Sequence, residues 1–254
     1  MKSGKYLQVG LTSFLIFTFL CSPIVTCTSR FNTALAAAEQ TIEPEAPPNG
    51  HEVEVNDPYE GFNRKVFEFN DRAYFYVLKP AASVYAAAFP SDFRKGIKTG
   101  FHNLVFPARF VNSMLQGKPD MAGIETVRFV INSSLGFAGM LDIAQTNFGL
   151  TGYDPDFGQT LGLWGAGSGP FLVVPLLGPS DERDLLGYAV DSAMDPLVWI
   201  PAVWWVSFSV ETGKFINNTS LRIGEYEELK KASLDPYVAT REAYTQYRAH
   251  LIEK

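Results

Sequence analysis

The sequence of 254 residues predicts an all-α fold. Every strongly periodic segment repeats its apolar residues at helical spacing, and no run alternates convincingly as a half-buried strand would. Hydrophobic residues make up 46% and charged residues 19%, a composition that excludes disorder for the bulk of the chain. Aromatic residues reach 14%, which fits either a thick core or a position at a membrane interface.

Residues 1–36 have the pattern of a signal peptide for export. Lys2 and Lys5 form a basic start, and residues 9–20 form an apolar stretch rich in Phe, Leu and Ile. Removing the segment would take away three positive charges and no acids, so the formal charge would change from −6 to −9. The acidic balance leaves no basic stripe for phosphates, so we expect no nucleic-acid partner.

The end of this segment has three interpretations that stay open. The small residues Ala34 and Ala36 favour cleavage near residue 36, because a leader peptidase accepts only small side chains there. Lipidation of Cys27 is the second, although Thr26 stands where a lipobox has Gly, Ala or Ser. An uncleaved membrane anchor is the third.

The next segment, residues 37–55, contains prolines and acids with little apolar periodicity, so we expect a flexible tether. Apolar residues at helical spacing then predict a helix over residues 59–78. Asp57 is the expected N-cap and Pro58 the expected first helical position. Pro80 is expected to end this helix, because proline lacks the backbone N–H of a helix interior.

Two more helices are predicted before the middle of the chain. One covers residues 91–115 and is interrupted near Pro107. The other covers residues 120–133, with Asp120 as its cap directly after Pro119.

No charged residue occurs between Asp156 and Asp181, where the chain has six glycines and three prolines. A simple transmembrane helix is excluded, because these prolines and glycines would break or weaken it. The segment is either a glycine-rich loop in a core or a hairpin presented to lipid or to a partner. Gly165, Gly167 and Gly169 are expected to give such a hairpin its flexibility.

Residues 196–210 form a second charge-free run, which contains Trp199, Trp204, Trp205 and Phe208. It is too short to cross a bilayer, which needs about 20 apolar residues. A helix lying in the membrane interface and a buried core helix explain it equally well.

The C-terminal part reads as one or two polar amphipathic helices over residues 221–252, broken at Asp235-Pro236. We therefore expect a helical domain over residues 56–217 and a C-terminal extension over residues 218–254.

A search for catalytic, metal and cofactor sites predicts none, so an enzyme is not expected. His102 is the one histidine inside the domain, and a Gly-x-Ser-x-Gly nucleophile motif is absent. Cysteine and histidine ligands are too few for zinc, and the aspartates do not have the spacing of an EF-hand. Asp181 and Asp195 instead each precede an expected helix, as N-caps do.

Four blocks in order along the chain carry a family resemblance. They are NDPYEGFNR (56–64) continuing to FEFND (67–71), RFVINSSLGFAG (128–139) with Asp142, DFGQTLGLWG (156–165), and GPFLVVPLLGPS (169–180) followed by Arg183 and Asp184. Together they resemble the MlaA family, also called VacJ. Many members are lipoproteins with a clear lipobox, and the weak motif at Cys27 puts that anchor in doubt here.

The resemblance implies a ring-like helical domain embedded in the periplasmic leaflet of the outer membrane of a Gram-negative bacterium. Such a protein removes misplaced phospholipids from the outer leaflet and passes them to a soluble periplasmic carrier, often beside a trimeric porin. The alternative is a structural adaptor that binds a porin without moving lipid, and an envelope hydrolase is a third.

Under this hypothesis the apolar residues near the four blocks have expected roles. The residues expected along the lipid route are Phe137, Leu141, Trp164, Phe171 and Leu172. The expected interfacial anchors are Trp199, Trp204 and Trp205. The residues expected to hold the first helix in place are Asn56, Asp57, Pro58 and Asn63.

Overall fold

The computed structural model describes residues 55–199 and 204–253, so the expected signal peptide, most of the tether and Cys27 lie outside the described residues. The described chain is mostly helical, which confirms the predicted fold class. Its α-helices are α3 (Glu60–Ala73), α4 (Lys79–Ala88), α5 (Ser91–Leu104), α6 (Phe106–Leu115), α7 (Pro119–Ser134), α8 (Ile143–Phe148), α9 (Phe157–Leu163), α10 (Glu182–Ala193), α11 (Trp204–Ser220), α12 (Glu225–Ala232) and α13 (Pro236–Glu253).

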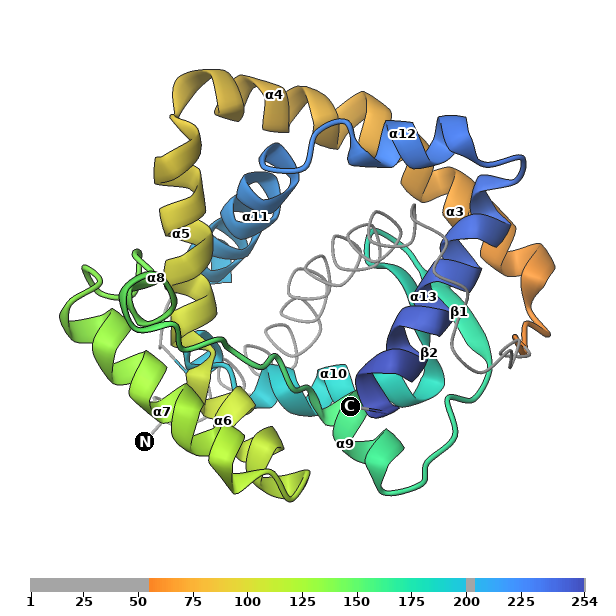
Figure 1. Cartoon of the computed structure of the whole chain (residues 1–254). Helices are drawn as coiled ribbons and strands as arrows, with labels where there is room; N and C mark the ends of the chain where they lie inside the picture. The colour runs from red at the N-terminus through yellow and green to blue at the C-terminus, as the bar shows by residue number, and fades with distance from the viewer. Residues whose placement is uncertain (1–54, 200–203, 254) are drawn as a thin grey trace, which may run out of the picture.

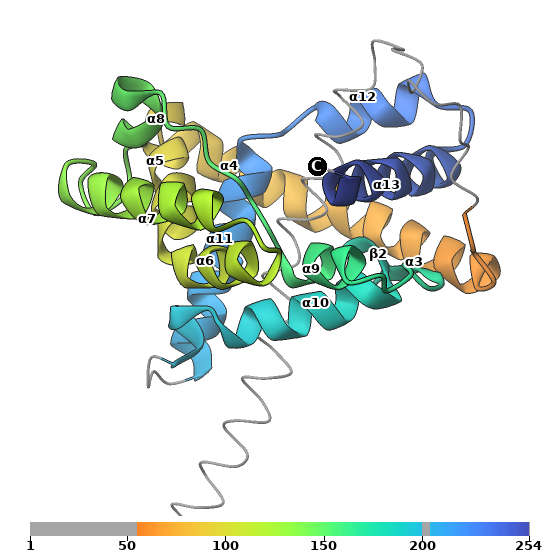
Figure 2. The ribbon, with the colours of Figure 1, turned by 60° about the horizontal axis from the view of Figure 1, so that its bottom comes forward.

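The helices follow one another around a common centre in the view of Figure 1. There, α3 and α4 continue into α5, and α7, α6 and α9 follow along the lower side, while α11 lies on the inner side of α4 and α5. α11 contacts both α4 and α5. Figures 1 and 2 both place α13 beside α9, and α13 contacts α9 and the strand β2 (Gly178–Asp181).

The first predicted helix extends further than expected, because Pro80 does not end it. A π-helical segment, Tyr74–Leu78, joins α3 to α4, and Pro80 lies in the first turn of α4. A π turn changes the backbone pairing from i−4 to i−5, which accommodates a residue without an N–H group. The expected cap was also wrong: the N-cap of α3 is Tyr59, and Asp57 contacts other elements.

The break near Pro107 is confirmed, since α5 ends at Leu104 and Pro107 lies in the first turn of α6. The start of α7 is one residue earlier than expected. Its N-cap is Lys118, so Asp120 lies within the first turn and is not the cap. An acidic residue in a first turn still interacts favourably with the helix dipole.

Two short strands appear where none was expected. β1 (Phe171–Val174) and β2 pair antiparallel, with Phe171 opposite Asp181 and Val174 opposite Gly178. Four residues per strand give too few repeats for a strand pattern to be recognised in the sequence. In addition, the sequence of β2 is Gly-Pro-Ser-Asp, and these residue types are depleted in strands.

The C-terminal helices are confirmed, with a break between α12 and α13 at residues 233–235. Tyr237 and Tyr244 of α13 are buried in one core cluster with Val66 of α3 and Phe171 of β1. The expected boundary after residue 217 falls inside α11. We therefore propose that residues 56–253 form one folding unit rather than a domain with an extension.

The run over residues 196–210 is not one helix. A 3₁₀ turn covers Pro196–Trp199, and α11 begins at Trp204 after residues that the structure does not describe. Among the described helices, none is both long enough and apolar enough to cross a bilayer.

Candidate functional site

The described part of the chain buries polar side chains and exposes large apolar ones. Apart from Tyr226, its largest side chains with less than 2% exposure are all polar or charged, among them Gln159, Glu125, Asn63 and Asp184. Charged residues are almost never fully buried in soluble domains unless they are paired. Paired polar side chains therefore stabilise the interior. The exposed apolar side chains are available for contact with a membrane or with another protein.

The exposed apolar side chains extend over most of the helices. Those that are most exposed include Tyr76 at 81%, Phe137 at 77%, Val84 at 73% and Trp199 at 71%. Others follow one another along single helices: Phe110, Val111, Met114 and Leu115 on α6, and Met121, Val127 and Val130 on α7. Contiguous apolar surface of this kind marks contact with a membrane or with another protein.

The first polar network joins α3 to β1 and α13. The side-chain amide of Asn63 donates to the Asp57 carboxylate (2.8 Å) and to the Phe171 carbonyl (3.0 Å). Tyr237 and Arg241 of α13 donate to the other Asp57 oxygen. Burial alone would raise the pKa of Asp57, but the hydrogen bonds from Tyr237, Asn63 and Arg241 lower it. Asp57 and Asn63 thus hold the first helix in place, the role expected for them from the sequence.

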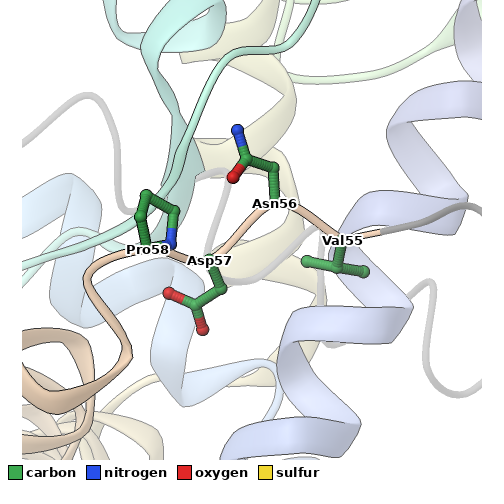
Figure 3. Close-up of a pocket in the computed structure, with 4 residues that line it drawn as sticks. All are labelled: Val55, Asn56, Asp57 and Pro58. Carbon is green, nitrogen blue, oxygen red and sulfur yellow. The ribbon is translucent and has the colours of Figure 1, made fainter.

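A pocket of about 540 Å³ opens beside the start of this network. Figure 3 shows its lining residues, Val55, Asn56, Asp57 and Pro58, along the extended segment that precedes α3. The carboxylate of Asp57 is already paired, so we assign this pocket to the packing of the segment and not to a ligand.

The second polar network supports the loop between α7 and α8. Arg128 donates to Asp142 (2.8 Å) and to the Leu150 carbonyl, and Asn132 donates to the other Asp142 oxygen (3.0 Å). Although burial raises the pKa of Asp142, the bonds from Asn132 and Arg128 lower it overall. In the same interior, Arg109 donates to Glu125 at 2.8 Å.

The loop that this network supports contains two of the residues expected along the lipid route, Phe137 and Leu141. Phe137, Ala138 and Gly139 all have positive φ angles of 52°, 56° and 87°. Leu135, Phe137 and Leu141 are more than half exposed. A backbone strained in this way persists only where the surrounding contacts determine it. The fold thus holds Phe137 and Leu141 outward.

The third polar network lies where α9, α10 and α13 meet. Arg248 donates to both Asp156 oxygens (2.6 and 3.0 Å) and to Asp184, and Tyr244 donates to Asp184 (2.5 Å). Asp181 caps α10 by accepting from the backbone N–H of Asp184 (2.7 Å). Burial, together with the negative charge of Asp184, raises the pKa of Asp181 to about 6.

The other expected lipid-route residues separate into exposed and buried ones. Trp164 is 57% exposed and donates to the Leu115 carbonyl, and Leu172 is partly exposed. Phe171 is in the core against Tyr237 and Tyr244, so it is unavailable to lipid and we remove it from the proposed route. It is buried because its place in β1 turns its side chain toward α3 and α13.

The glycines of the expected hairpin lie in the loop between α9 and β1. Gly165 and Gly169 have φ angles of +91° and +71°, which favour glycine, and Gly167 has open space around it. Of the expected interfacial tryptophans, Trp199 and Trp205 are exposed, and the side chain of Trp204 lies outside the described residues.

His102 and the acidic residues are the candidates for catalytic or metal chemistry in the sequence. The imidazole of His102 is 2.6 Å from a carboxylate oxygen of Asp154, at the surface. No group of three or more metal-ligating side chains occurs within the described ranges. Asp181 and Asp195 accept from the backbone at helix starts, as the sequence predicted.

The polar networks were missed by sequence reasoning as a functional feature. Most of their residues belong to the four sequence blocks or to the C-terminal helices, but the pairing partners are as many as 184 positions apart. The signal that could have indicated these networks is the set of polar residues in the four blocks, such as Arg128, Asn132, Asp142 and Asp156.

Comparison with known proteins identifies relatives across most of the chain. A family model described as MlaA lipoprotein matches residues 55–251. The intermembrane phospholipid transport system lipoprotein MlaA of Escherichia coli K12 is 34% identical over 197 residues, which cover 75% of this chain and 76% of the relative. The protein of the same name from Haemophilus influenzae is 34% identical over 205 residues, with coverages of 76% and 78%.

A solved structure is also similar. It comes from work on the structural basis for maintenance of bacterial outer membrane lipid asymmetry. It superposes on this chain with a TM-score of 0.68 and 34% identity, and the match covers 77% of this chain and 98% of the solved one. The similarity thus extends over nearly all of the described residues.

Proposed function

Because this chain belongs to the MlaA lipoprotein family, we propose that it carries phospholipids between the membranes of a bacterial envelope. We further propose the direction: it removes misplaced phospholipids from the outer leaflet of the outer membrane and passes them to a soluble periplasmic carrier. The name of the Escherichia coli relative and the subject of the structural work on the solved neighbour support this proposal.

The observation that carries the proposal is the inverted distribution of side chains. Many large apolar side chains are exposed, while paired polar groups fill much of the inside. Burying a large apolar side chain contributes about 1.5–3 kcal/mol, so such a surface favours transfer into lipid. We propose that the domain lies within one leaflet of the membrane, and its exposed apolar side chains support this placement.

Lipid contacts are assigned to the exposed apolar residues near the four blocks. Phe137 and Leu141 extend from the α7–α8 loop, and Trp164 and Leu172 flank the glycine-rich loop after α9. Trp199 and Trp205 are proposed as interfacial anchors, since indole rings favour the headgroup region. Gly165, Gly167 and Gly169 would let the α9–β1 loop move when lipid passes.

The proposed location is the periplasmic side of the outer membrane, with a trimeric porin as a neighbour. The mechanism requires binding and release of lipid without covalent chemistry, so no catalytic group or cofactor is assigned. Cleavage of the signal peptide near residue 36, lipidation of Cys27 and an uncleaved membrane anchor stay the three alternatives for the N-terminal segment.

The test is the amount of phospholipid on the cell surface in a strain that lacks this gene. We expect surface phospholipid to rise on deletion and to return to its normal level with the intact gene. Substitution of both Trp164 and Leu172 by Ser should fail to restore it, despite a normal amount of protein. Unchanged surface phospholipid in the deletion strain would contradict the proposal.

A second candidate is a structural adaptor that binds a porin without moving lipid. The exposed side chains of Trp199 and Trp205 favour it, because tryptophan is enriched at protein interface hot spots. Under this alternative, replacing both tryptophans by Ser would abolish porin binding, and purified protein would move no phospholipid between vesicles.

A further inference from the structure

One carboxylate in the middle of α11 is buried with an oxygen that has no partner. Glu211 is 7% exposed, and its Oε1 accepts a hydrogen bond from Lys214 at 3.1 Å. Its Oε2 is buried and makes no hydrogen bond with the residues that the structure describes. A buried ionised group without a partner costs several kcal/mol, so this position needs an explanation.

The charges around Glu211 do not balance. The ammonium of Lys214 also lies 3.8 Å from Asp195, so two carboxylates share one ammonium. That ammonium lies over the ring of Phe101, 5.3 Å from its centroid. The Asp195 oxygen farther from Lys214 accepts from the backbone of Leu197 (2.9 Å), which leaves the Glu211 Oε2 as the unpaired acceptor of this group.

The protonation equilibrium of Glu211 agrees with this imbalance. Burial raises the pKa of Glu211, Lys214 lowers it, and the negative charge of Asp195 adds to the increase. The net effect is a raised pKa, mainly because of burial, so the charged form of this carboxylate has a deficit of stabilisation in the folded chain. A second cation beside the Oε2 would remove that deficit.

Two exposed apolar side chains lie on the same helix as Glu211. Phe208, one helical turn earlier on α11, is half exposed, and Trp205 is 56% exposed. α11 lies on the inner side of α4 and α5 in Figure 1. α11 thus carries exposed apolar side chains within two turns of a buried acidic acceptor, and a lipid with a cationic headgroup would use both.

From these contacts we propose that Glu211 recognises the primary ammonium of a phospholipid headgroup, with Phe208 and Trp205 against the acyl chains. This proposal rests on the proposed lipid-transfer function and adds a headgroup preference to it. In the absence of lipid the carboxylate stays against Lys214. When lipid binds, the Glu211 side chain turns toward Phe208 and its Oε2 accepts one N–H of the headgroup ammonium.

The experiment uses the purified mature chain and donor vesicles that contain equal amounts of phosphatidylethanolamine, phosphatidylcholine and phosphatidylglycerol. Mass spectrometry measures which lipids the protein takes up. We expect wild-type protein to favour phosphatidylethanolamine by about tenfold, because a charge-assisted hydrogen bond contributes at least that factor. Phosphatidylcholine carries the same net charge but cannot donate N–H bonds, so it isolates the role of the ammonium protons.

The variants separate recognition from folding. Glu211→Gln removes the charge at nearly constant shape and should reduce the preference to about twofold or less, while Glu211→Asp should retain it. Glu242→Gln, on an exposed part of α13, is the matched control and should behave as wild type. If Glu211→Gln does not fold, the ratio of phosphatidylethanolamine to phosphatidylcholine taken up by wild-type protein still tests the proposal. Equal uptake of the two lipids would overturn it.

The remaining outcomes are distinguishable from one another. An unchanged lipid ratio in a folded Glu211→Gln variant would overturn this inference and leave the lipid-transfer function standing. An equal loss of all three lipids in that variant would assign Glu211 a structural role and also overturn it. If wild-type protein takes up no lipid, the proposed function itself fails. Equal thermal stabilisation by free phosphoethanolamine would indicate a soluble ligand and contradict the lipid source.

Discussion

Asn63 and Val173 are 110 positions apart in the sequence, yet the Val173 backbone N–H donates to the Asn63 side chain at 2.9 Å. The same amide group donates to the Phe171 carbonyl at 3.0 Å. One asparagine of the first helix therefore takes the place of a neighbouring strand for β1. The NDPYEGFNR block holds the sheet in this way.

Replacing Asn63 by Ala should lower the free energy of unfolding by about 2–4 kcal/mol. The substitution leaves the Phe171 carbonyl and the Val173 N–H buried without partners, and each costs about 1–3 kcal/mol. Chemical denaturation in detergent, followed by circular dichroism, would measure the change. The exposed Asn147→Ala is the control and should stay within about 0.5 kcal/mol of wild type. A similar small loss for Asn63→Ala would contradict the assigned role.

Asp181 should make stability depend on pH near neutrality. Burial and Asp184 raise its folded pKa from 3.8 to about 6. The folded state therefore binds a proton more readily than the unfolded state, so stability should increase as the pH falls from about 7 to about 4.5. Asp181→Asn should remove this dependence, which we expect to be about 2 kcal/mol, while it keeps a capping oxygen for α10. Unfolding curves at pH 7 and pH 4.5 measure the free energy of unfolding at each pH. An equal change between the two pH values for wild type and Asp181→Asn would contradict this prediction.

Gly136 should not accept a side chain. A Cβ atom there would lie 2.3 Å from the Leu141 carbonyl oxygen and 2.5 Å from that of Asn132. Gly136→Ala should therefore displace the α7–α8 loop and reduce stability by about 1–3 kcal/mol, and it should also reduce lipid transfer. Gly123→Ala, in α7 with open space around it, is the control and should be neutral or stabilising. A Gly136→Ala protein with normal stability and transfer would contradict the loop geometry.

Phe137 should contribute to membrane binding and not to folding. Its side chain is 77% exposed, so Phe137→Ser should leave the unfolding transition within about 0.5 kcal/mol of wild type. Loss of one buried phenyl group from the bilayer should weaken vesicle binding by about tenfold or more. Co-flotation with vesicles measures this binding. Phe171→Ala provides the contrast, since truncating a core phenylalanine should cost about 3–5 kcal/mol of stability. Unchanged flotation of Phe137→Ser would remove Phe137 from the lipid contacts.

Local sequence patterns determined most of the helices. The break near Pro107 and the gap before Pro236 follow from the chemistry of proline within a few residues, and the helical periodicity between them is equally local. Local patterns gave the wrong prediction where contacts with residues outside the segment determine the conformation. Pro80 is accommodated by a π turn inside a longer helix, and Asp57 pairs with Tyr237 and Arg241 instead of capping α3.

The residues of the candidate site were also predicted only in part from the sequence. The sequence identified Phe137, Leu141 and Trp164 as apolar residues in unusual blocks, and their exposure is compatible with the proposed lipid contacts. It could not separate them from Phe171, which is equally apolar but turned into the core by its place in β1. Exposure depends on what packs against a residue, and for Phe171 those partners come from α3 and α13.

By itself, the sequence determined the helical fold class and the family resemblance, because periodicity and motif order are properties of neighbouring residues. Only the tertiary structure decided which polar groups pair inside and which apolar groups stay outside. Arg248 reaches Asp156 across 92 positions, and Glu211 is left with an oxygen that has no partner. The physical reason is that burial and charge pairing depend on distance in space, which a single sequence does not record.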